Sequence, residues 1–284
     1  MPVVTGTGTG PAVRAPASSA NLGAGFDVLG MALDLPVDVG VGEAPEGARP
    51  ADDRHPARRA FERLGGSGPV WWRTRIPMAR GLGSSAAMRV GGAALAVVAD
   101  GGRIEGEAQA VLDVAAELEG HGDNAAAALH GGVTAYVAGA ARRVPLGPVL
   151  AAAAVVAWVP DVTTSTDRSR RALPERVDRS AAVANIGRAS QLVLAVATDD
   201  PSLLVGATDD ALHQAERLPA VEGAAEAIER GVAAGAWCGW LSGSGPTVAL
   251  LAARDVVDEV VAALPPGGHP RVLSIDPLGA RALP

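Results

Sequence analysis

The sequence predicts an α+β fold, in which short paired strands alternate with groups of helices. Two segments with strand-like alternation come early, and a long proline-free run of Ala, Val and Leu follows them. A second pair of apolar segments near the C-terminus is joined by a glycine-rich turn. Because strands occur in pairs between helices, the order favours α+β over a doubly wound parallel sheet.

The first half of the chain opens with predicted strands. Segments 26–42 and 70–76 alternate between apolar and polar residues, as half-buried strands do. Between them, residues 43–59 are polar and contain three prolines. We therefore expect a loop there that leads into a helix near 56–64.

Helices are expected next. Ser84 and Ser85 precede good helix formers that continue to about Ala99, which indicates a helix start. Residues 107–119 place apolar side chains at i, i+3, i+4 and i+7, the spacing of a buried helical face, and Gly120 ends that helix. The remaining elements of this half are a short helix and a strand, expected at 124–130 and 132–138.

The second half has a comparable mixture. Residues 149–159 form an apolar run that predicts a buried strand and is too short to span a bilayer. Gly and Pro cluster near Pro145–Pro148, so we expect one unit at 1–146 and another at 147–284. Further helices are expected at 179–198, 201–216, 220–234 and 254–264, and further strands at 236–241, 247–252 and 271–275.

Composition excludes several kinds of chemistry. The chain has 284 residues, and all 24 of its Lys and Arg residues are Arg. This rules out a Walker A lysine, a protein-kinase strand lysine and any lysine Schiff base. With 31 acidic residues the formal charge is −7, so we expect no nucleic-acid partner.

Cysteine content and the N-terminal sequence bear on location. The single cysteine, Cys238, excludes an internal disulfide and a zinc site built from cysteines. The first residues lack the charged patch and apolar run of a signal peptide. We therefore expect a cytoplasmic protein that has no membrane partner.

The segment IPMARGLGSSAA, residues 76–87, is the most informative motif. It consists of a strand end, a loop with Gly81 and Gly83, two hydroxyl groups and a helix start. Backbone N–H groups of such a loop converge, and the helix adds its positive end, so the loop can hold a di- or triphosphate without lysine. Serine at the helix start can add a Mg²⁺ ligand. Taken alone, the segment also fits an ordinary strand–loop–helix turn.

Two other segments carry polar side chains close together. In EGHGDN, residues 119–124, groups able to bind metal or exchange protons fall at a helix end, although His121 and Asp123 alone also fit helix capping. In PASSANLGAGFD, residues 16–27, Asn21 and Asp27 flank a glycine turn.

Two arginines and one further turn complete the set of candidates. Arg170 and Arg217 carry the planar fork that grips a carboxylate, although a single arginine is more often simply solvated. The segment LSGSGPT, residues 241–247, is a glycine turn between two strands.

Together these motifs resemble the GHMP kinases. IPMARGLGSSAA resembles the phosphate loop of that family. PASSANLGAGFDVLG, EGHGDN, TSTDRSRRALP, NIGRASQL, DDALHQAERLP and LSGSGPTVALL resemble its homoserine kinase branch in order and spacing, from about residue 14 to 252. The resemblance implies a two-domain GHMP kinase fold, with a ribosomal-protein-like, ATP-binding N-terminal domain, a ferredoxin-like C-terminal domain and the active site between them. It also implies phosphorylation of L-homoserine by ATP, a step in threonine biosynthesis.

The resemblance assigns roles residue by residue. Ser85 and Glu119 are expected to bind Mg²⁺, directly or through water. Arg170 and Arg217 are expected to hold the carboxylate of homoserine, with Thr166 beside Arg170. The residues expected to hold the triphosphate are Pro77, Met78, Ala79, Arg80, Gly81, Leu82, Gly83, Ser84, Ser85, Ala86 and Ala87. Those expected around the amino and hydroxyl ends of homoserine are Asn21, Asp27, His121, Asp123 and Asn124, of which Asn124, Asp123 and His121, with Ser85, are the expected catalytic group.

The resemblance also implies how the reaction proceeds. Where mevalonate kinase has an aspartate beside the acceptor hydroxyl, the homoserine kinases have an asparagine, here Asn124. The chain has no lysine for that place either. We therefore expect no strong protein base at this position, and catalysis by positioning and charge neutralisation.

Alternatives remain open at this level. Arg170, Arg217 and Asp27 suit any α-amino acid, so the acceptor could be another hydroxy-amino acid such as threonine. A kinase-like protein that senses its ligands without turnover is the second alternative. A homodimer is the expected assembly.

Overall fold

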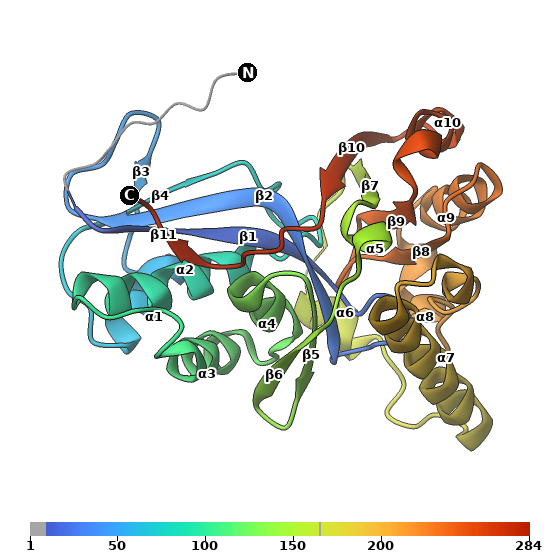
Figure 1. The fold of residues 1–284 in the computed structure, drawn as a ribbon, viewed down its shortest axis with the longest axis horizontal. Coiled ribbons are helices and arrows are strands. Elements are labelled where there is room, and N and C mark those ends of the chain that lie inside the picture. Colours follow the sequence, from blue (N-terminus) through green and yellow to red (C-terminus); the bar gives the residue numbers. More distant parts are fainter. Residues whose placement is uncertain (1–9, 165) are drawn as a thin grey trace.

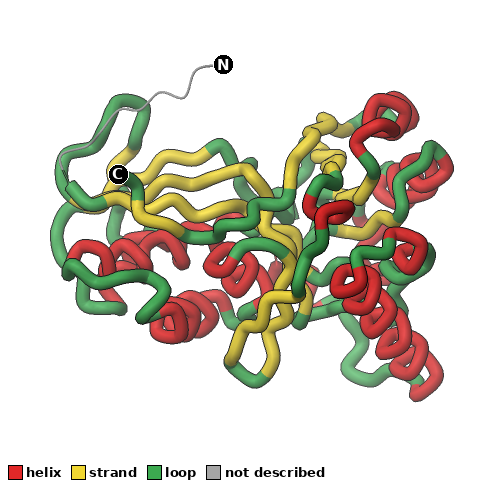
Figure 2. The backbone as a smooth tube through the Cα atoms, viewed as in Figure 1, coloured by secondary structure: helices red, strands yellow, loops and turns green. Residues whose placement is uncertain are grey.

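The computed structural model describes residues 10–164 and 166–284, and the side chains of residues 166–168 lie outside the described part. Its strands form two antiparallel sheets (Figures 1 and 2). The first sheet has the order β11-β1-β2-β4-β3, with β5 paired to β2 and β6 to β5, and the second has the order β10-β7-β9-β8. Helices and strands are mixed as expected, so the predicted α+β class is confirmed.

The first sheet and its helices come from the first half of the chain, apart from β11. The strands are β1 (Ala12–Ala20), β2 (Leu29–Val41), β3 (Arg49–Pro50), β4 (Val70–Thr74), β5 (Val133–Val137), β6 (Ala140–Val144) and β11 (Arg281–Ala282). The helices are α1 (Pro56–Arg63), α2 (Ser84–Ala99), α3 (Ala108–Glu119) and α4 (Asp123–His130), and they lie on one side of this sheet (Figure 1).

The second sheet and the remaining helices come from the second half of the chain. The strands are β7 (Ala154–Pro160), β8 (Cys238–Leu241), β9 (Val248–Ala252) and β10 (Gly268–Ser274). The α-helices are α5 (Pro148–Ala151), α6 (Thr166–Arg171), α7 (Arg179–Thr198), α8 (Gln214–Arg217), α9 (Ala224–Ala233) and α10 (Val257–Ala263), and short 3₁₀ turns are η1 (Pro201–Leu204), η2 (Leu218–Ala220) and η3 (Arg254–Val256).

Helix α2 packs closely on the first sheet because its buried face is built from small residues. A Cβ added at Gly91 would lie 3.0 Å from Val39 Cγ2, and one added at Gly92 would lie 2.0 Å from the Ala57 carbonyl oxygen of α1. Such close packing fixes the helix axis. The N-terminus of α2, where the glycine loop ends, is therefore held in a defined place.

Several elements differ from the expectation. The structure has strand β1 where the sequence suggested only a turn after Pro16, and the expected helix at 201–216 is a 3₁₀ turn, further turns and the short α8. Within 149–159, the strand begins only at Ala154, because Pro148 starts helix α5. The division at residues 146 and 147 stays a prediction, since the chain returns at its end to pair β11 with β1.

Candidate active site

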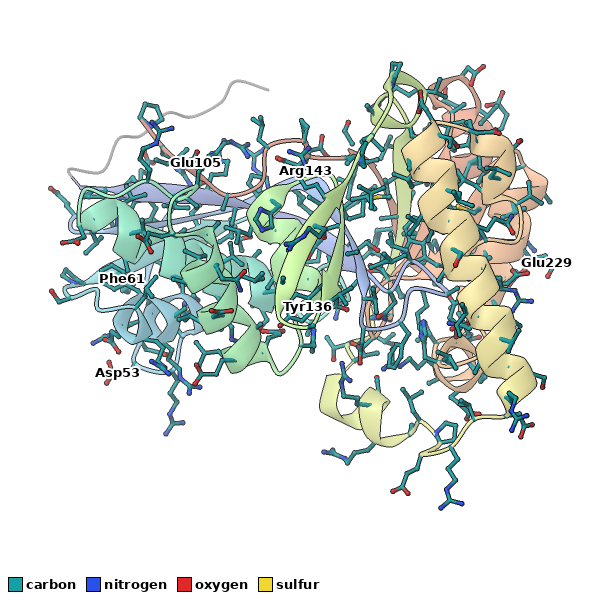
Figure 3. All side chains as sticks on the ribbon, turned by 60° about the horizontal axis from the view of Figure 1, so that its bottom comes forward. Asp53, Phe61, Glu105, Tyr136, Arg143 and Glu229 are labelled. Atoms are coloured by element: carbon teal, nitrogen blue, oxygen red, sulfur yellow. The ribbon has the colours of Figure 1, made fainter. Side chains whose placement is uncertain are left out.

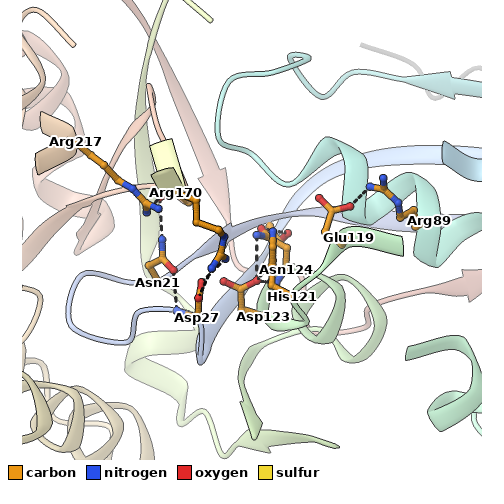
Figure 4. A network of polar contacts seen from close by, with 11 residues as sticks. Asn21, Asp27, Arg89, Glu119, His121, Asp123, Asn124, Arg170 and Arg217 are labelled. Atoms are coloured by element: carbon orange, nitrogen blue, oxygen red, sulfur yellow. Dashed lines mark hydrogen bonds and ion pairs between the residues drawn. The ribbon is translucent and has the colours of Figure 1, made fainter. Parts of the chain in front are cut away.

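A cleft lies where the glycine loop before α2 meets the α3–α4 turn and segments of the second half. The side chains in this region point toward one another (Figure 4). The residues that line the cleft are Asn21, Asp27, Ala79, Gly81, Gly83, Ser84, Ser85, Glu119, His121, Asp123, Asn124, Thr164, Arg170, Arg217, Gly243 and Ser244. The motifs that the sequence singled out separately therefore share one cleft.

The glycine loop requires its glycines. Gly83 is the N-cap of α2, with φ +62°, and an added Cβ would lie 2.1 Å from Ser18 Oγ and 2.9 Å from Asn124 Oδ1. Gly81 has φ +74°, and its Cβ would lie 2.4 Å from the Ser242 carbonyl oxygen. The first N–H groups of any α-helix have no acceptor within the helix, and in α2 no side chain caps them either. The cap is thus a glycine, and these N–H groups are available to an anion.

A chain of hydroxyl groups ties the glycine loop to the second half of the molecule. Trp240 Nε1 donates to Ser19 Oγ (2.9 Å), and the hydroxyls of Ser19 and Ser242 are 2.7 Å apart. Ser242 Oγ donates in turn to the Gly81 carbonyl oxygen (2.6 Å). Buried hydrogen bonds of this kind are costly to break. They hold the loop against the β8–β9 turn.

His121, Asp123 and Asn124 form a buried polar group at the start of α4. Asp123 Oδ1 lies 2.6 Å from His121 Nδ1 and accepts a hydrogen bond from the Asn124 backbone N–H (2.7 Å). Asn124 Oδ1 accepts from Ser18 Oγ (2.9 Å). The Asn124 amide is therefore oriented with its oxygen occupied by Ser18.

Asp27 and Arg170 form a two-pronged ion pair. Both of their hydrogen bonds measure 2.7 Å. Asn21 lies beside Asp27: its Oδ1 accepts from the Asp27 N–H (3.1 Å), and its Nδ2 donates to the Gly243 carbonyl oxygen (2.8 Å). Asn21 thus braces the turn that carries Asp27 against the β8–β9 turn.

Arg217 is buried in the cleft wall. Arg217 is only 6% exposed, and its Nη1 atom lies 3.4 Å from both His213 Nδ1 and the Gly243 carbonyl oxygen. Burial, and secondarily the nearby Arg170, lower the pKa of the Arg217 guanidinium. Among the residues that the structure describes, no carboxylate lies within 4.0 Å of Arg217, and its buried Nε has no partner. The cleft therefore holds a buried cation whose charge is not paired.

One aromatic ring lies close to both arginines. The Phe26 ring lies 5.8 Å from the Arg170 guanidinium carbon and 5.2 Å from that of Arg217. The same ring stacks on buried His213 at 5.0 Å between centroids. His213 Nε2 lies 3.0 Å from the Gly23 carbonyl oxygen, so Nε2 carries the hydrogen and Nδ1 faces Arg217 as an acceptor. These contacts set the positions of both guanidinium groups.

Glu119 and Ser85 share one partner. Arg89, one turn beyond Ser85 on α2, donates to Ser85 Oγ and forms an ion pair with the Glu119 carboxylate (Figure 4). Among the described residues, no group of three or more His, Cys, Asp or Glu side chains could hold a metal ion. A metal site here would consist of hydroxyl and carboxylate oxygens completed by other ligands.

Not every predicted site residue lines the cleft with its side chain. Leu82, Ala86 and Ala87 are buried in the core, so the phosphate loop could use only their backbone groups. Pro77, Met78 and Arg80 lie on the same loop but not in the cleft lining, and the Thr166 side chain lies outside the described residues. The residues that sequence reasoning did not assign to the site are Ser18, Ser19, Phe26, Arg89, Thr164, His213, Trp240, Ser242, Gly243 and Ser244.

Comparisons with known proteins identify the family of the chain. Residues 56–132 match the GHMP kinases N terminal domain. A homoserine kinase of Streptomyces coelicolor is 41% identical over 297 residues, covering 96% of this chain and 94% of the relative. A homoserine kinase of Thermus thermophilus is 38% identical and covers 93% of this chain and 96% of the relative.

Solved structures share the fold. The crystal structure of homoserine kinase from Cytophaga hutchinsonii superimposes with a TM-score of 0.79 at 24% identity, covering 100% of both chains. The mevalonate kinase of Methanococcus jannaschii gives a TM-score of 0.70 at 12% identity, covering 96% of this chain and 99% of that one. The predicted GHMP kinase fold is confirmed, and the chain belongs to the homoserine kinase family of GHMP kinases.

Proposed function

We propose that this protein transfers the terminal phosphoryl group of ATP to the side-chain hydroxyl of L-homoserine, forming O-phospho-L-homoserine for threonine biosynthesis. The observation that carries the proposal is the unpaired, buried guanidinium of Arg217 in the same cleft as the glycine loop before α2. A buried charge without a partner is expensive, so the site is built for an anion. The names of the relatives support the carboxylate of homoserine as that anion.

Homoserine would bind as a zwitterion. Its carboxylate would lie against Arg217, and its ammonium group would take a share of the Asp27 carboxylate. Asp27 is already paired with Arg170 through two hydrogen bonds. The substrate would therefore bind by exchange of ion pairs. Its ammonium group would take the place of Arg170 on Asp27, and the freed Arg170 would turn to the substrate carboxylate.

ATP would occupy the glycine loop, Pro77 to Ala87. The carbonyl oxygens of Ala79, Gly81 and Leu82 accept hydrogen bonds from other parts of the protein. The N–H groups at the start of α2 remain for the phosphates. This is how a chain without lysine would bind a triphosphate.

Mg²⁺ fits the oxygen atoms present. Ser85 Oγ and the Glu119 carboxylate converge on one cationic group, and both are ligands that Mg²⁺ accepts alongside phosphates and water. When bound, the ion would neutralise charge that develops on the phosphates.

The chain's own residues would position the acceptor. The homoserine hydroxyl would attack the γ-phosphorus as the bond to the β–γ bridging oxygen breaks, and its proton would leave late, to a phosphate oxygen or water. Asn124, held by Ser18, would orient the hydroxyl without accepting a proton. Asp123 stays engaged with His121 and the backbone of Asn124. Catalysis would then come from alignment and charge neutralisation.

A panel of acceptors tests the proposal. L-homoserine, L-threonine, L-serine and a no-acceptor control would be compared by coupled ADP release, with the phosphorylated product identified by ³¹P NMR. We expect the highest kcat/KM for L-homoserine. A preference for threonine or serine would show that homoserine is not the substrate. Tight binding of ATP and Mg²⁺ without a phosphorylated product would favour a sensing role.

The assembly and the location also belong to the proposal. Helix α7 is long and apolar enough to cross a membrane by length and composition alone, but it runs along the outside of the molecule beside η1 (Figure 3). Exposed Val183, Ile186 and Leu194 follow one another at helical spacing along one face. We infer that this stripe joins two copies in a cytoplasmic homodimer. The negative charge of −7 argues against a nucleic-acid partner.

A further inference from the structure

A partly buried arginine stands between the two oxygens that would bind the metal. Arg89 donates to Ser85 Oγ and pairs with the Glu119 carboxylate, and the side chains of Arg89 and Glu119 are only 16% and 14% exposed. Ser85 and Arg89 are four residues apart on α2, so both face the end of α3. The Arg89 Nη1 atom is therefore where a cation shared by these oxygens would lie.

The guanidinium and a metal ion cannot use these oxygens together. Arg89 Nη1 contacts both Ser85 Oγ and the Glu119 carboxylate, so it occupies the space that a shared metal ion would need, and two cations in that space would repel each other. Guanidinium supplies one positive charge and directed N–H donors, whereas Mg²⁺ supplies two charges but gives up water reluctantly. The guanidinium therefore holds its place in the gap through its contacts with Ser85 and Glu119.

We propose that Arg89 is a positioning residue that fills the Ser85–Glu119 gap in the nucleotide-free protein and competes with Mg²⁺ for it. The proposal rests on the proposed nucleotide site, but not on the identity of the phosphoryl acceptor. The ion enters only when it displaces the guanidinium, which requires the further ligands that nucleotide phosphates bring. Arg89 therefore makes metal binding depend on nucleotide, and it neutralises the charge of the Glu119 carboxylate when no metal ion is bound.

Metal binding without nucleotide tests the proposal directly. Mn²⁺ would be titrated into the native protein, Arg89→Met and Arg103→Met, and free Mn²⁺ followed by its EPR signal. Arg103→Met removes the same charge from an exposed position outside the site. We expect Arg89→Met to bind Mn²⁺ about tenfold more tightly than the native protein, and Arg103→Met to stay near the native value. Equal or weaker binding by Arg89→Met would overturn the proposal.

Thermal unfolding separates this role from a purely structural tie between α2 and α3. Arg89→Met should unfold at a lower temperature, and Mg²⁺ alone should restore much of the loss while leaving the native protein unchanged. Destabilisation without metal rescue would refute the proposal. If Arg89→Met does not fold, Arg89→Gln keeps a hydrogen-bond donor without the charge and should show the same tighter binding, which Glu119→Gln in the same chain should abolish. None of these readouts needs homoserine, so a wrong acceptor would leave them unchanged.

Discussion

Asp123 is the residue that decides whether the reaction uses a protein base. Its carboxylate is buried and already accepts hydrogen bonds from His121 and from the backbone of Asn124. We expect Asp123→Asn to lower kcat less than about tenfold, since an amide oxygen can keep these bonds and positioning supplies most of the catalysis. Steady-state kinetics with homoserine would measure it. A fall of several orders of magnitude in kcat with an unchanged KM would show that Asp123 takes the proton.

His213 makes stability depend on pH. Burial lowers the pKa of its imidazole, against the opposing charge of Asp210, so the folded protein holds it neutral. A lowered pKa means that the unfolded chain binds the proton more readily. The contribution of His213 to stability is therefore fully present above about pH 6.5. As the pH falls below that value, this contribution decreases by at most about 1.4 kcal/mol per pH unit.

Urea unfolding at about pH 7.5 and pH 5 would check this contribution. The stability difference between the two pH values should be smaller in His213→Gln than in the native protein. His269→Gln, at an exposed position, is the matched control and should leave the difference unchanged. An equal difference in all three proteins would exclude His213 as the source.

Much of the candidate site was predictable at the level of residues, because its members occupy short motifs. Glu119, His121, Asp123 and Asn124 lie within six residues, so local spacing brings them together. Arg89 was not predictable in this way, because its role depends on α2 meeting the end of α3. Phe26 and His213 lie inside motifs that were recognised, but their stacking joins segments distant in the chain.

The conformation of the glycine loop before α2 can be tested by substituting Gly83. Gly83→Ala would place a Cβ at left-handed φ, 2.1 Å from Ser18 Oγ. We expect it to lower the free energy of unfolding by about 1–3 kcal/mol and to weaken ATP binding, because the loop must move. Gly187→Ala is the matched control: it lies in α7 with nothing within 4 Å of the added Cβ, and should stabilise by about 0.5–1 kcal/mol. Unfolding curves and ATP titration would measure both, and unchanged ATP binding in Gly83→Ala would contradict the role of the loop.

The elements that were predicted well have strong local signals. Helix α7 has the predicted bounds, and α2 and α3 each begin within one residue of the predicted start, because their sequences are long runs of helix formers. Strand β1 is not indicated by alternation, because PASSA has none and consecutive residues from Ala15 to Ala20 are all buried. The stretch 201–216 looked helical by composition, but Gly206 at φ +72° and Asp210, which accepts from the N–H groups of His213 and Gln214, favour turns.

At the scale of the whole molecule, the two sheets are joined by the chain's own end. Strand β11 pairs with β1, and Gly131 approaches Gly279 so closely that a Cβ would lie 2.6 Å from its nitrogen. These contacts lie far apart in the sequence and leave no local pattern. Sequence periodicity therefore indicated the α+β class but could not indicate this closure.

The proposed homodimer is tested at the same scale. Ile186→Asp would place a charge in the centre of the exposed stripe on α7. We expect the native protein to have about twice the chain mass of 28.4 kDa by light scattering after gel filtration, and Ile186→Asp to have the single-chain mass. A native monomer, or a dimer that survives the substitution, would place the stripe outside the interface.

Recognition of the carboxylate of a hydroxy-amino acid by Arg217 is tested by one comparison of kcat/KM. The acceptors are L-homoserine and 3-aminopropan-1-ol, which keeps the hydroxyl and amino groups but lacks the carboxylate, with the native protein and Arg217→Met. The native protein should prefer homoserine by about 10³-fold, and the preference should fall to about tenfold in Arg217→Met. The same preference in both proteins would show that Arg217 does not bind the carboxylate of the acceptor.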